Sequence, residues 1–284
     1  MKFSWCFWRP GGFVRLAAAL ICFIAPAAAW NDTGHMVVAE IAWRHLDAQT
    51  KARVEPLVAL GASPRNNTFV TAACWADDLK REEVDFYNSW HFIDLSWSID
   101  GTPAPTVPQI NIVWALEKCR DTLQSPKAPD IEKARALRFL IHLVGDIHQP
   151  LHCISLYSQQ LPRGDRGGNL FKISGEPEDN LHWFWDNGGG AFRFSVFRPL
   201  TDRGQKELAK LADQCEAETP IAKTDDTDFY RWAQESYQLA KTTVYSDIEM
   251  DHSPTQQYSL RAQTVARQRV SLAGRRLAEI LNGM

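Results

Sequence analysis

The segment from Arg138 to His152, RFLIHLVGDIHQPLH, constrains the fold of this 284-residue chain more than any other. It is apolar nearly all round, which predicts a helix buried on every side. His142 and Asp146 lie four residues apart and therefore share one face of that helix. A charged carboxylate buried beside an imidazole is costly unless something neutralises it, and a metal ion does so directly. Pro150 should end the helix and leave His152 free to point back toward the same region.

A second segment, LHWFWD (Leu181–Asp186), repeats this arrangement with His182 and Asp186. One such pair would favour a structural hydrogen bond in the core, but two pairs in buried helices favour a metal site. Imidazole and carboxylate donors without thiolate are typical of hydrolytic zinc sites, and the number of candidates suits two or three ions. With other His and Asp residues in similar apolar settings, the candidates are His35, Asp77, His91, His142, Asp146, His152, His182 and Asp186.

Helical periodicity extends over most of the chain and predicts a mainly α, multi-helix fold, with no internal repeat. In the C-terminal helix, apolar residues at helical spacing should form the packing face while several arginines point to water; these apolar residues are Leu260, Val265, Leu272 and Leu277. The expected helices are Met36–Leu46, Val107–Leu123, Pro129–Ile147, Leu181–Trp185, Gln205–Cys215, Asp226–Tyr245 and Thr255–Leu281.

Strand signals are sparse. Leu170–Ser174 and Phe192–Val196 are short candidates that could pair as a β-ribbon. The loop from Ser155 to Asn169 and the run of glycines at 188–190 have the composition of surface connections. The chain from residue 30 to 284 is therefore expected to form one helical domain with at most a short ribbon.

Residues 1–29 have the pattern of a signal peptide that is removed. An uncharged apolar run from Leu16 to Ala25 is shorter than the roughly 20 residues that span a membrane, so an uncleaved anchor is the less favoured alternative. Small residues precede Trp30 at the usual cleavage offsets, which predicts cleavage after Ala29 and export to the periplasm or the medium. The cationic residues at the start are Lys2, Arg9 and Arg15.

Cleavage at this point changes the charge balance. It removes three of the 31 basic residues and none of the 34 acidic ones, leaving 28 against 34 and a net charge of −6. Such a chain has no global basic field, so a polyanionic substrate must be held locally, by metal or a few cationic side chains. An even number of cysteines remains for an oxidising compartment, which makes two disulfides plausible in any of three pairings; they are Cys74, Cys119, Cys153 and Cys215.

The sequence resembles the S1/P1 nuclease family of zinc-dependent, single-strand-specific nucleases, within the phospholipase C/P1 nuclease superfamily. The resemblance runs from Trp30 to about Asn187. Each motif is weak alone, but their order and spacing together are specific. The motifs are WNDTGH, WADD, WHFID, HLVGDIHQPLH, GDRGGN and NLHWFWD.

The resemblance implies three zinc ions and a role for the mature N-terminus. In the family, the N-terminal tryptophan chelates zinc through its α-amine and backbone carbonyl, which implies the same for Trp30, together with His35 and Asp146. The resemblance implies a second zinc on Asp77, His91, His142 and Asp146, and a third on His152, His182 and Asp186. Asp146 would then bridge two ions. His148 is interpreted as a residue supporting the ligands, His45 as a core residue and His252 as a surface residue.

The implied reaction is phosphodiester hydrolysis by a zinc-bridging hydroxide, with Asp146 as the essential bridging residue. Lys80 matches a basic residue that contacts phosphate, although a solvated surface lysine is the alternative. Phe92 and Asp94 match the base-stacking aromatic and base-contacting carboxylate of the family. Asn169 and Asn187 are weaker candidates for the same pocket.

The expected activity is cleavage of single-stranded RNA and DNA to 5′-phosphate products, with 3′-nucleotidase activity. A zinc-dependent phospholipase C is the closest alternative, but Asp186 and the five-residue step from Trp30 to His35 favour the nuclease. A non-catalytic zinc-binding protein is the other. The chain departs from the family at Asn31, where glycine is frequent, and in a longer loop after His152. We expect a monomer without an obligate protein partner and without membrane attachment after cleavage.

Overall fold

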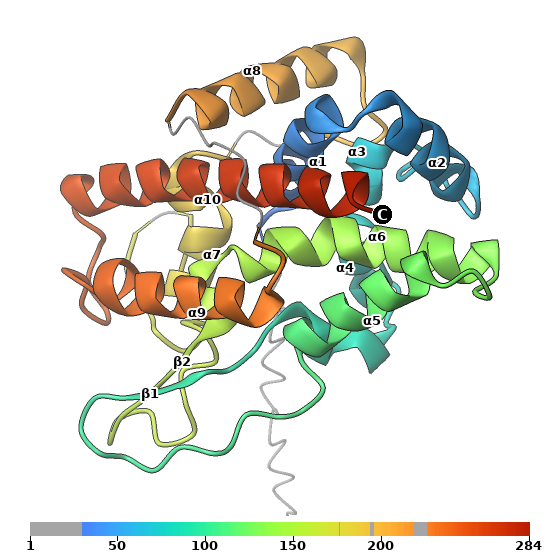
Figure 1. The fold of residues 1–284 in the computed structure, drawn as a ribbon. Coiled ribbons are helices and arrows are strands. Elements are labelled where there is room, and N and C mark those ends of the chain that lie inside the picture. Colours follow the sequence, from blue (N-terminus) through green and yellow to red (C-terminus); the bar gives the residue numbers. More distant parts are fainter. Residues whose placement is uncertain (1–29, 176, 194–195, 219–225) are drawn as a thin grey trace, which may run out of the picture.

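The computed structural model describes residues 30–175, 177–193, 196–218 and 226–284, so the expected signal peptide lies outside the described residues. Helices dominate the described chain, which confirms the mainly α prediction (Figure 1). The longer helices are α1 (Asp32–His45), α2 (Ala48–Ala59), α5 (Ile112–Gln124), α6 (Asp130–Ile147), α8 (Asp202–Glu218), α9 (Phe229–Leu239) and α10 (Gln256–Asn282). The short ones are α3 (Phe69–Ala72), α4 (Trp75–Arg81), η1 (Asp85–His91), η2 (Pro150–Cys153), α7 (Leu181–Asp186), η3 (Gly188–Gly190) and the π-helical turn η4 (Ala240–Val244).

Helix α6 is the central element of the molecule. It begins after Pro129, and acidic residues in its first turn favour the positive end of the helix dipole. From Ala136 to Ile147 every residue is buried, because α2, α4, α5 and α10 all pack against it. The helix ends before Pro150, and the 3₁₀ turn η2 that follows carries His152 back into the protein. The predicted buried helix is therefore confirmed.

Helices α1 and α10 form the second main packing pair, and α8 covers them (Figure 1). The Asn31 side chain caps α1 by accepting a hydrogen bond from the Gly34 amide (3.0 Å). The two helices approach closely at Gly274, where a Cβ atom would lie 2.6 Å from the Cβ of Ile41. This contact holds the middle of α1, at Ile41, closely against α10.

The short sheet agrees with the prediction of at most a short ribbon, but it does not use the first predicted strand, Leu170–Ser174. The strands are β1 (Ser96–Ser98) and β2 (Ser155–Tyr157), which pair in parallel. In the predicted first strand only an isolated antiparallel bridge between Lys172 and Asn180 forms. The second candidate includes residues 194–195, which lie outside the described residues. The β1–β2 pair lies at the base of two long loops (Figure 1).

The expected packing face of the C-terminal helix is also partly wrong. Leu260 is 57% exposed, whereas Arg269 and Arg276 are buried. Both arginines contact the Glu235 carboxylate of α9, which compensates their charges in the interior. Helical spacing alone could not reveal a partner on another helix.

The four cysteines among the described residues are buried free thiols, so neither expected disulfide is present. They belong to four separate segments: the N-cap of α4, α5, the end of η2 and α8. No helix among the described residues is both long and apolar enough to cross a membrane.

Candidate metal centre

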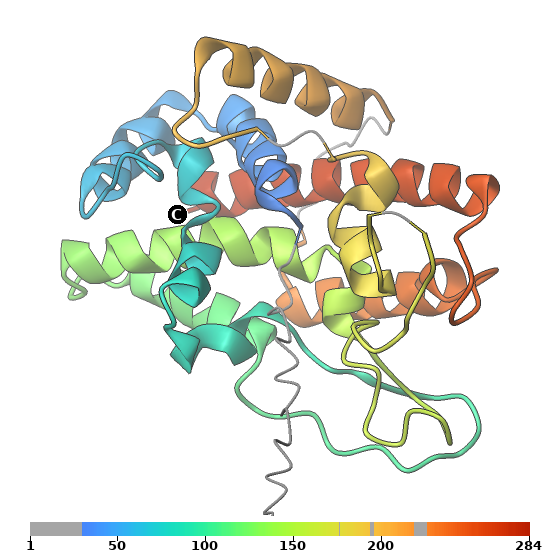
Figure 2. The same cartoon turned by 180° about the vertical axis from the view of Figure 1, so that it is seen from behind.

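The candidate ligands come from four α-helices and two 3₁₀ helices that meet around the C-terminal half of α6. His35 lies in the first turns of α1, Asp77 in α4 and His91 at the end of η1. The others belong to α6, η2 and α7, and all eight are buried. Figure 2 shows the start of α1, the end of α6 and α7 from the side on which they converge.

Asp146 is the centre of this group. Its Oδ1 lies 3.3 Å from Nε2 of His35, and its Oδ2 lies 2.9 Å from Nδ1 of His91 and 3.1 Å from Nε2 of His142. The rings of His35 and His142 stack at 4.0 Å. Oδ1 of Asp77 lies 3.7 Å from Nε2 of His142. A single carboxylate thus faces three imidazoles, as a residue shared between two ions would.

The candidate ligands form three groups, and within each group the donor atoms lie within 4.8 Å of one another. The groups are His35, Asp77 and His142; His91, His142 and Asp146; and His152, His182 and Asp186. The third set contains the same residues as the predicted third zinc site. The first two overlap through His142 and together contain all the side chains expected to hold the other two ions. The division of these ligands between individual ions stays a prediction.

Three of the histidines are fixed by backbone carbonyls in the manner of metal ligands. Nδ1 of His142 bonds the Ala73 carbonyl (2.6 Å), Nδ1 of His152 bonds that of His91 (2.7 Å), and Nδ1 of His182 bonds that of Gly167 (2.6 Å). A carbonyl only accepts, so the proton sits on Nδ1 and Nε2 keeps its lone pair for the centre. Nε2 of His152 is buried without a hydrogen-bond partner in the described part of the chain. These residues fit a divalent metal with nitrogen and oxygen ligands.

The pKa values of two carboxylates of the centre, Asp146 and Asp186, are shifted in opposite directions. Burial opposes ionisation of Asp146, but His142, His35 and His91 outweigh it and hold its pKa well below the usual range. Burial raises the pKa of Asp186 well above its usual range, even though Gln149 donates a hydrogen bond to it (2.8 Å). A cation beside Asp186 would favour its ionised form.

Trp30 lies directly against this centre. The residue is fully buried, and its Nε1 donates to the Gly145 carbonyl in α6 (3.0 Å). The backbone amide of the next residue, Asn31, donates to the carbonyl of Asp186 (3.0 Å). The structure thus brings the expected mature N-terminus beside both His/Asp segments, and its role as a ligand stays a prediction.

The three main candidates for substrate contact, Lys80, Phe92 and Asp94, differ from one another in burial and surroundings. Nζ of Lys80 lies 3.1 Å from Oδ1 of Asp77, and its side chain is only 8% exposed, so the solvated-lysine alternative does not describe it. Phe92 is 38% exposed and follows His91 directly. Burial, and then the nearby Asp165, raises the pKa of Asp94 to about 6.

The two asparagines have internal partners. The amide of Asn187 donates to the buried Glu178 (2.8 Å) and accepts from Asn31 (2.7 Å), while the Asn169 amide donates to the carbonyl of Arg166 (2.7 Å). Both side chains therefore hold local structure. Their predicted contact with substrate stays a prediction.

The remaining histidines lie away from the centre. His148 is buried, but its Nδ1 bonds the Val144 carbonyl and its Nε2 faces Arg276, so it contacts α10 and not the candidate ligands. His45 is half-buried, with its Nε2 in contact with the Glu216 carboxylate (2.6 Å), and is no apolar core residue. His252 is exposed, as expected.

Sequence reasoning assigned no structural role to three residues that contact the candidate ligands or their immediate neighbours in the chain: Asn31, Gln149 and Arg198. Asn31 belongs to the WNDTGH motif, and its backbone amide donates to the backbone carbonyl of Asp186. Gln149 belongs to HLVGDIHQPLH, and its side chain donates to the carboxylate of Asp186. Arg198 lies in a segment without any motif. Its partners are far away in sequence, so no local signal could have found it.

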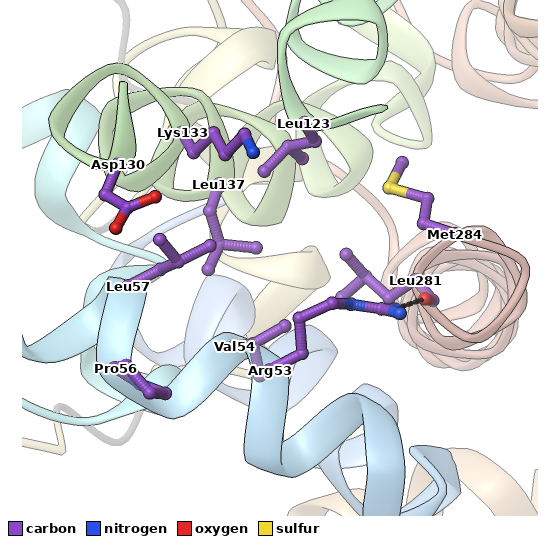
Figure 3. A pocket seen from close by; sticks show the side chains of 10 residues that line it. All are labelled: Arg53, Val54, Pro56, Leu57, Leu123, Asp130, Lys133, Leu137, Leu281 and Met284. Carbon is purple, nitrogen blue, oxygen red and sulfur yellow. Dashed lines mark hydrogen bonds between the residues drawn. The ribbon is translucent and has the colours of Figure 1, made fainter. Parts of the chain in front are cut away.

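A cavity of about 250 Å³ lies elsewhere, between α2, α5, α6 and the end of α10 (Figure 3). Its walls are largely apolar, formed by Val54, Leu57, Leu137 and their neighbours. None of the candidate ligands or substrate residues lines it. The chemistry of the His/Asp centre is therefore separate from this cavity.

Imidazole and carboxylate donors, buried where helices meet and free of thiolate, give this mainly α protein a candidate centre of the kind found in metal-dependent hydrolases. The S1/P1 nuclease family model matches residues 30–284, and the chain belongs to this family. Membership supports a hydrolase that acts on nucleic acids.

Curated relatives agree with this assignment. The chain is 26% identical over 200 residues to nuclease S1 of Aspergillus oryzae, covering 66% of this chain and 65% of that enzyme. It is 26% identical over 271 residues to endonuclease 2 of Arabidopsis thaliana, covering 89% of each. Nuclease P1 of Penicillium citrinum is 25% identical over 169 residues, which are 55% of this chain and 57% of that one.

Proposed function

We propose that this protein is an exported, zinc-dependent nuclease that hydrolyses single-stranded RNA and DNA to 5′-phosphate products and also acts as a 3′-nucleotidase. The proposal includes removal of residues 1–29, a single catalytic domain over residues 30–284, and action as a monomer in the periplasm or outside the cell. The observation that carries it is the set of three buried His/Asp groups around Asp146.

Zinc bound at these groups supplies Lewis-acid chemistry, activating water and neutralising phosphate charge. The protein's part is to hold nitrogen and oxygen donors in fixed positions. Hydrogen bonds from Nδ1 to backbone carbonyls set the tautomers of His142, His152 and His182. Trp30 and His35 would complete a site with Asp146, and Asp77 with His91 would complete the neighbouring one.

Lys80 and Phe92 are the contacts that we propose for a nucleotide bound at this centre. The Lys80 ammonium lies against the candidate ligand Asp77, which supports a role for Lys80 in contacting the phosphate of a bound substrate. The exposed face of Phe92 offers a surface for an unpaired base, and stacking of this kind contributes about 1–3 kcal/mol per base whatever the sequence. A paired base must leave its helix before it can stack there, which accounts for a single-strand preference.

The test uses protein secreted by a host that removes the leader. Single-stranded RNA, a 3′-mononucleotide and phosphatidylcholine are supplied in parallel, with and without a chelator, and the product ends are mapped. Chelator-sensitive release of 5′-phosphorylated nucleotides, with the lipid intact, is the expected result. Cleavage of the lipid alone would indicate a phospholipase C, and zinc binding without hydrolysis would indicate a binding protein; either result would overturn the proposal.

A further inference from the structure

Arg198 is a fully buried cation that the proposed mechanism does not use. Its side chain is 0% exposed, and it lies in the segment that precedes α8. An arginine in the interior must be paired, because an unpaired buried charge is costly. Its partners are Asp32 and Asp78, 166 and 120 residues earlier in the chain.

The guanidinium bonds both carboxylates at once. Nη2 donates to Oδ2 of Asp32 (2.7 Å), and Nε approaches the same oxygen (3.2 Å). Nη1 donates to Oδ2 of Asp78 (2.7 Å), and Nη2 donates to its Oδ1 (3.0 Å). The second pairing has the two-pronged geometry that arginine makes with a carboxylate and lysine cannot reproduce.

Electrostatics agree with this geometry. Burial opposes the ionised form of Asp32, but Arg198 and then Arg81 lower its pKa below the usual value. Burial likewise disfavours the charged guanidinium, yet Asp78 and Asp32 raise the pKa of Arg198. The Arg198 guanidinium and the Asp32 carboxylate are therefore held in their charged forms, and we call the group formed by Arg198, Asp32 and Asp78 the Arg198 bridge.

The positions of the two aspartates give the bridge its significance. Asp32 opens α1, two residues after Trp30 and three before His35. Asp78 follows Asp77 directly in α4. The bridge therefore joins the helix that carries the N-terminal candidate ligands to the helix that carries Asp77.

We propose that Arg198 is a positioning residue for the metal centre. It fixes α1 and α4 at the spacing that lets His35 and Asp77 serve neighbouring ions. This inference rests on the proposed function, because it concerns the same metal centre. Arg198 itself touches neither metal nor substrate, and it acts through Asp32 and Asp78.

The test compares Arg198→Met and Arg198→Lys with Arg44→Met. Arg44 is a matched control because it also bonds several carboxylates, those of Glu40, Asp213 and Glu216, but at the far end of α1. Zinc per chain after dialysis, zinc affinity, Tm and kcat/KM on single-stranded RNA are measured for each. Residues that orient metal ligands typically change affinity or activity 10- to 100-fold.

We expect Arg198→Met to bind at least one zinc roughly 10- to 100-fold more weakly, with kcat/KM falling in step. Arg198→Lys should have an intermediate zinc affinity, because it keeps the positive charge but loses the two-pronged guanidinium contact. This variant provides the measurement if Arg198→Met does not fold. Arg44→Met should lose Tm but keep its zinc. Wild-type zinc affinity in a folded Arg198 variant, or equal losses in Arg198→Met and Arg44→Met, would overturn the positioning role alone. A wild-type protein that binds no zinc would overturn the proposed function and this inference together.

Discussion

Substitution of Gly145 by alanine tests how tightly the N-terminal ligands fit against α6. A Cβ atom at this position would lie 2.8 Å from Nδ1 of His35, 3.1 Å from its Cε1 and 3.8 Å from Cδ1 of Trp30. Ordinary contact begins at 3.4 Å, so the His35 ring must retreat by about 0.6 Å. Metal–ligand distances in functional sites hold to about 0.2 Å, so this displacement exceeds what a metal tolerates.

The fold should suffer much less than the site. Alanine is favoured over glycine inside a helix by about 1 kcal/mol, while overpacking a core costs about 1–3 kcal/mol. The free energy of unfolding of Gly145→Ala should therefore fall by only about 0–2 kcal/mol. Zinc affinity and kcat/KM should fall roughly 10- to 100-fold.

The control is Gly274→Ala in α10. A Cβ atom there would lie 2.6 Å from the Cβ of Ile41 and 2.9 Å from the carbonyl of Val38, so it overpacks α1 against an apolar neighbour. This variant should lose more Tm than Gly145→Ala, yet keep its zinc affinity once folded. Isothermal titration with zinc, thermal unfolding and RNA hydrolysis separate the two. Wild-type zinc affinity in Gly145→Ala, or losses in both variants proportional to stability, would refute the reasoning.

Three further predictions concern the candidate metal centre and the proposed base contacts Phe92 and Asp94. Asp146→Asn should lose both activity, by on the order of 1,000-fold, and zinc, because a neutral amide cannot serve two cations; a fully active, zinc-replete variant would exclude the bridging role. Phe92→Ala should reduce kcat/KM on RNA by about five- to 150-fold, the equivalent of one lost base stack, while Tyr230→Ala on the exposed surface of α9 should change nothing; equal effects would exclude stacking. The pKa of Asp94 in the folded chain, about 6, lies above the unfolded value, so the folded state holds its proton more tightly and loses stability as pH rises from about 4 to 6. Asp94→Asn should therefore raise Tm relative to wild type at pH 8 and much less at pH 4, and a difference independent of pH would contradict the buried carboxylate.

The features that sequence predicted are those with a local pattern. Helix α6 was predictable because its apolar run, its opening proline and Pro150 all agree. The four-residue spacing of His142 and Asp146 is enough to place both on one helical face. Motifs identify the remaining ligand candidates, and the fold brings all eight side chains together.

The sequence predictions that failed concern contacts between residues that are distant in the sequence. Strands β1 and β2 have only three residues each, so period-two alternation cannot mark them, and they pair across more than 50 residues. The buried arginines of α10 depend on Glu235 in another helix. No local pattern around Arg198 indicates its partners, and only the fold reveals its contacts with Asp32 and Asp78.

We propose that the free amine of Trp30 completes one of the zinc sites. The most direct test compares the chain that begins at Trp30 with the same chain carrying one extra alanine before it, measuring zinc per molecule by elemental analysis. Circular dichroism and Tm establish that both are folded. We predict three zinc ions in the first protein and two in the second, with loss of nuclease activity in the second. Equal zinc content and activity in both would contradict the account.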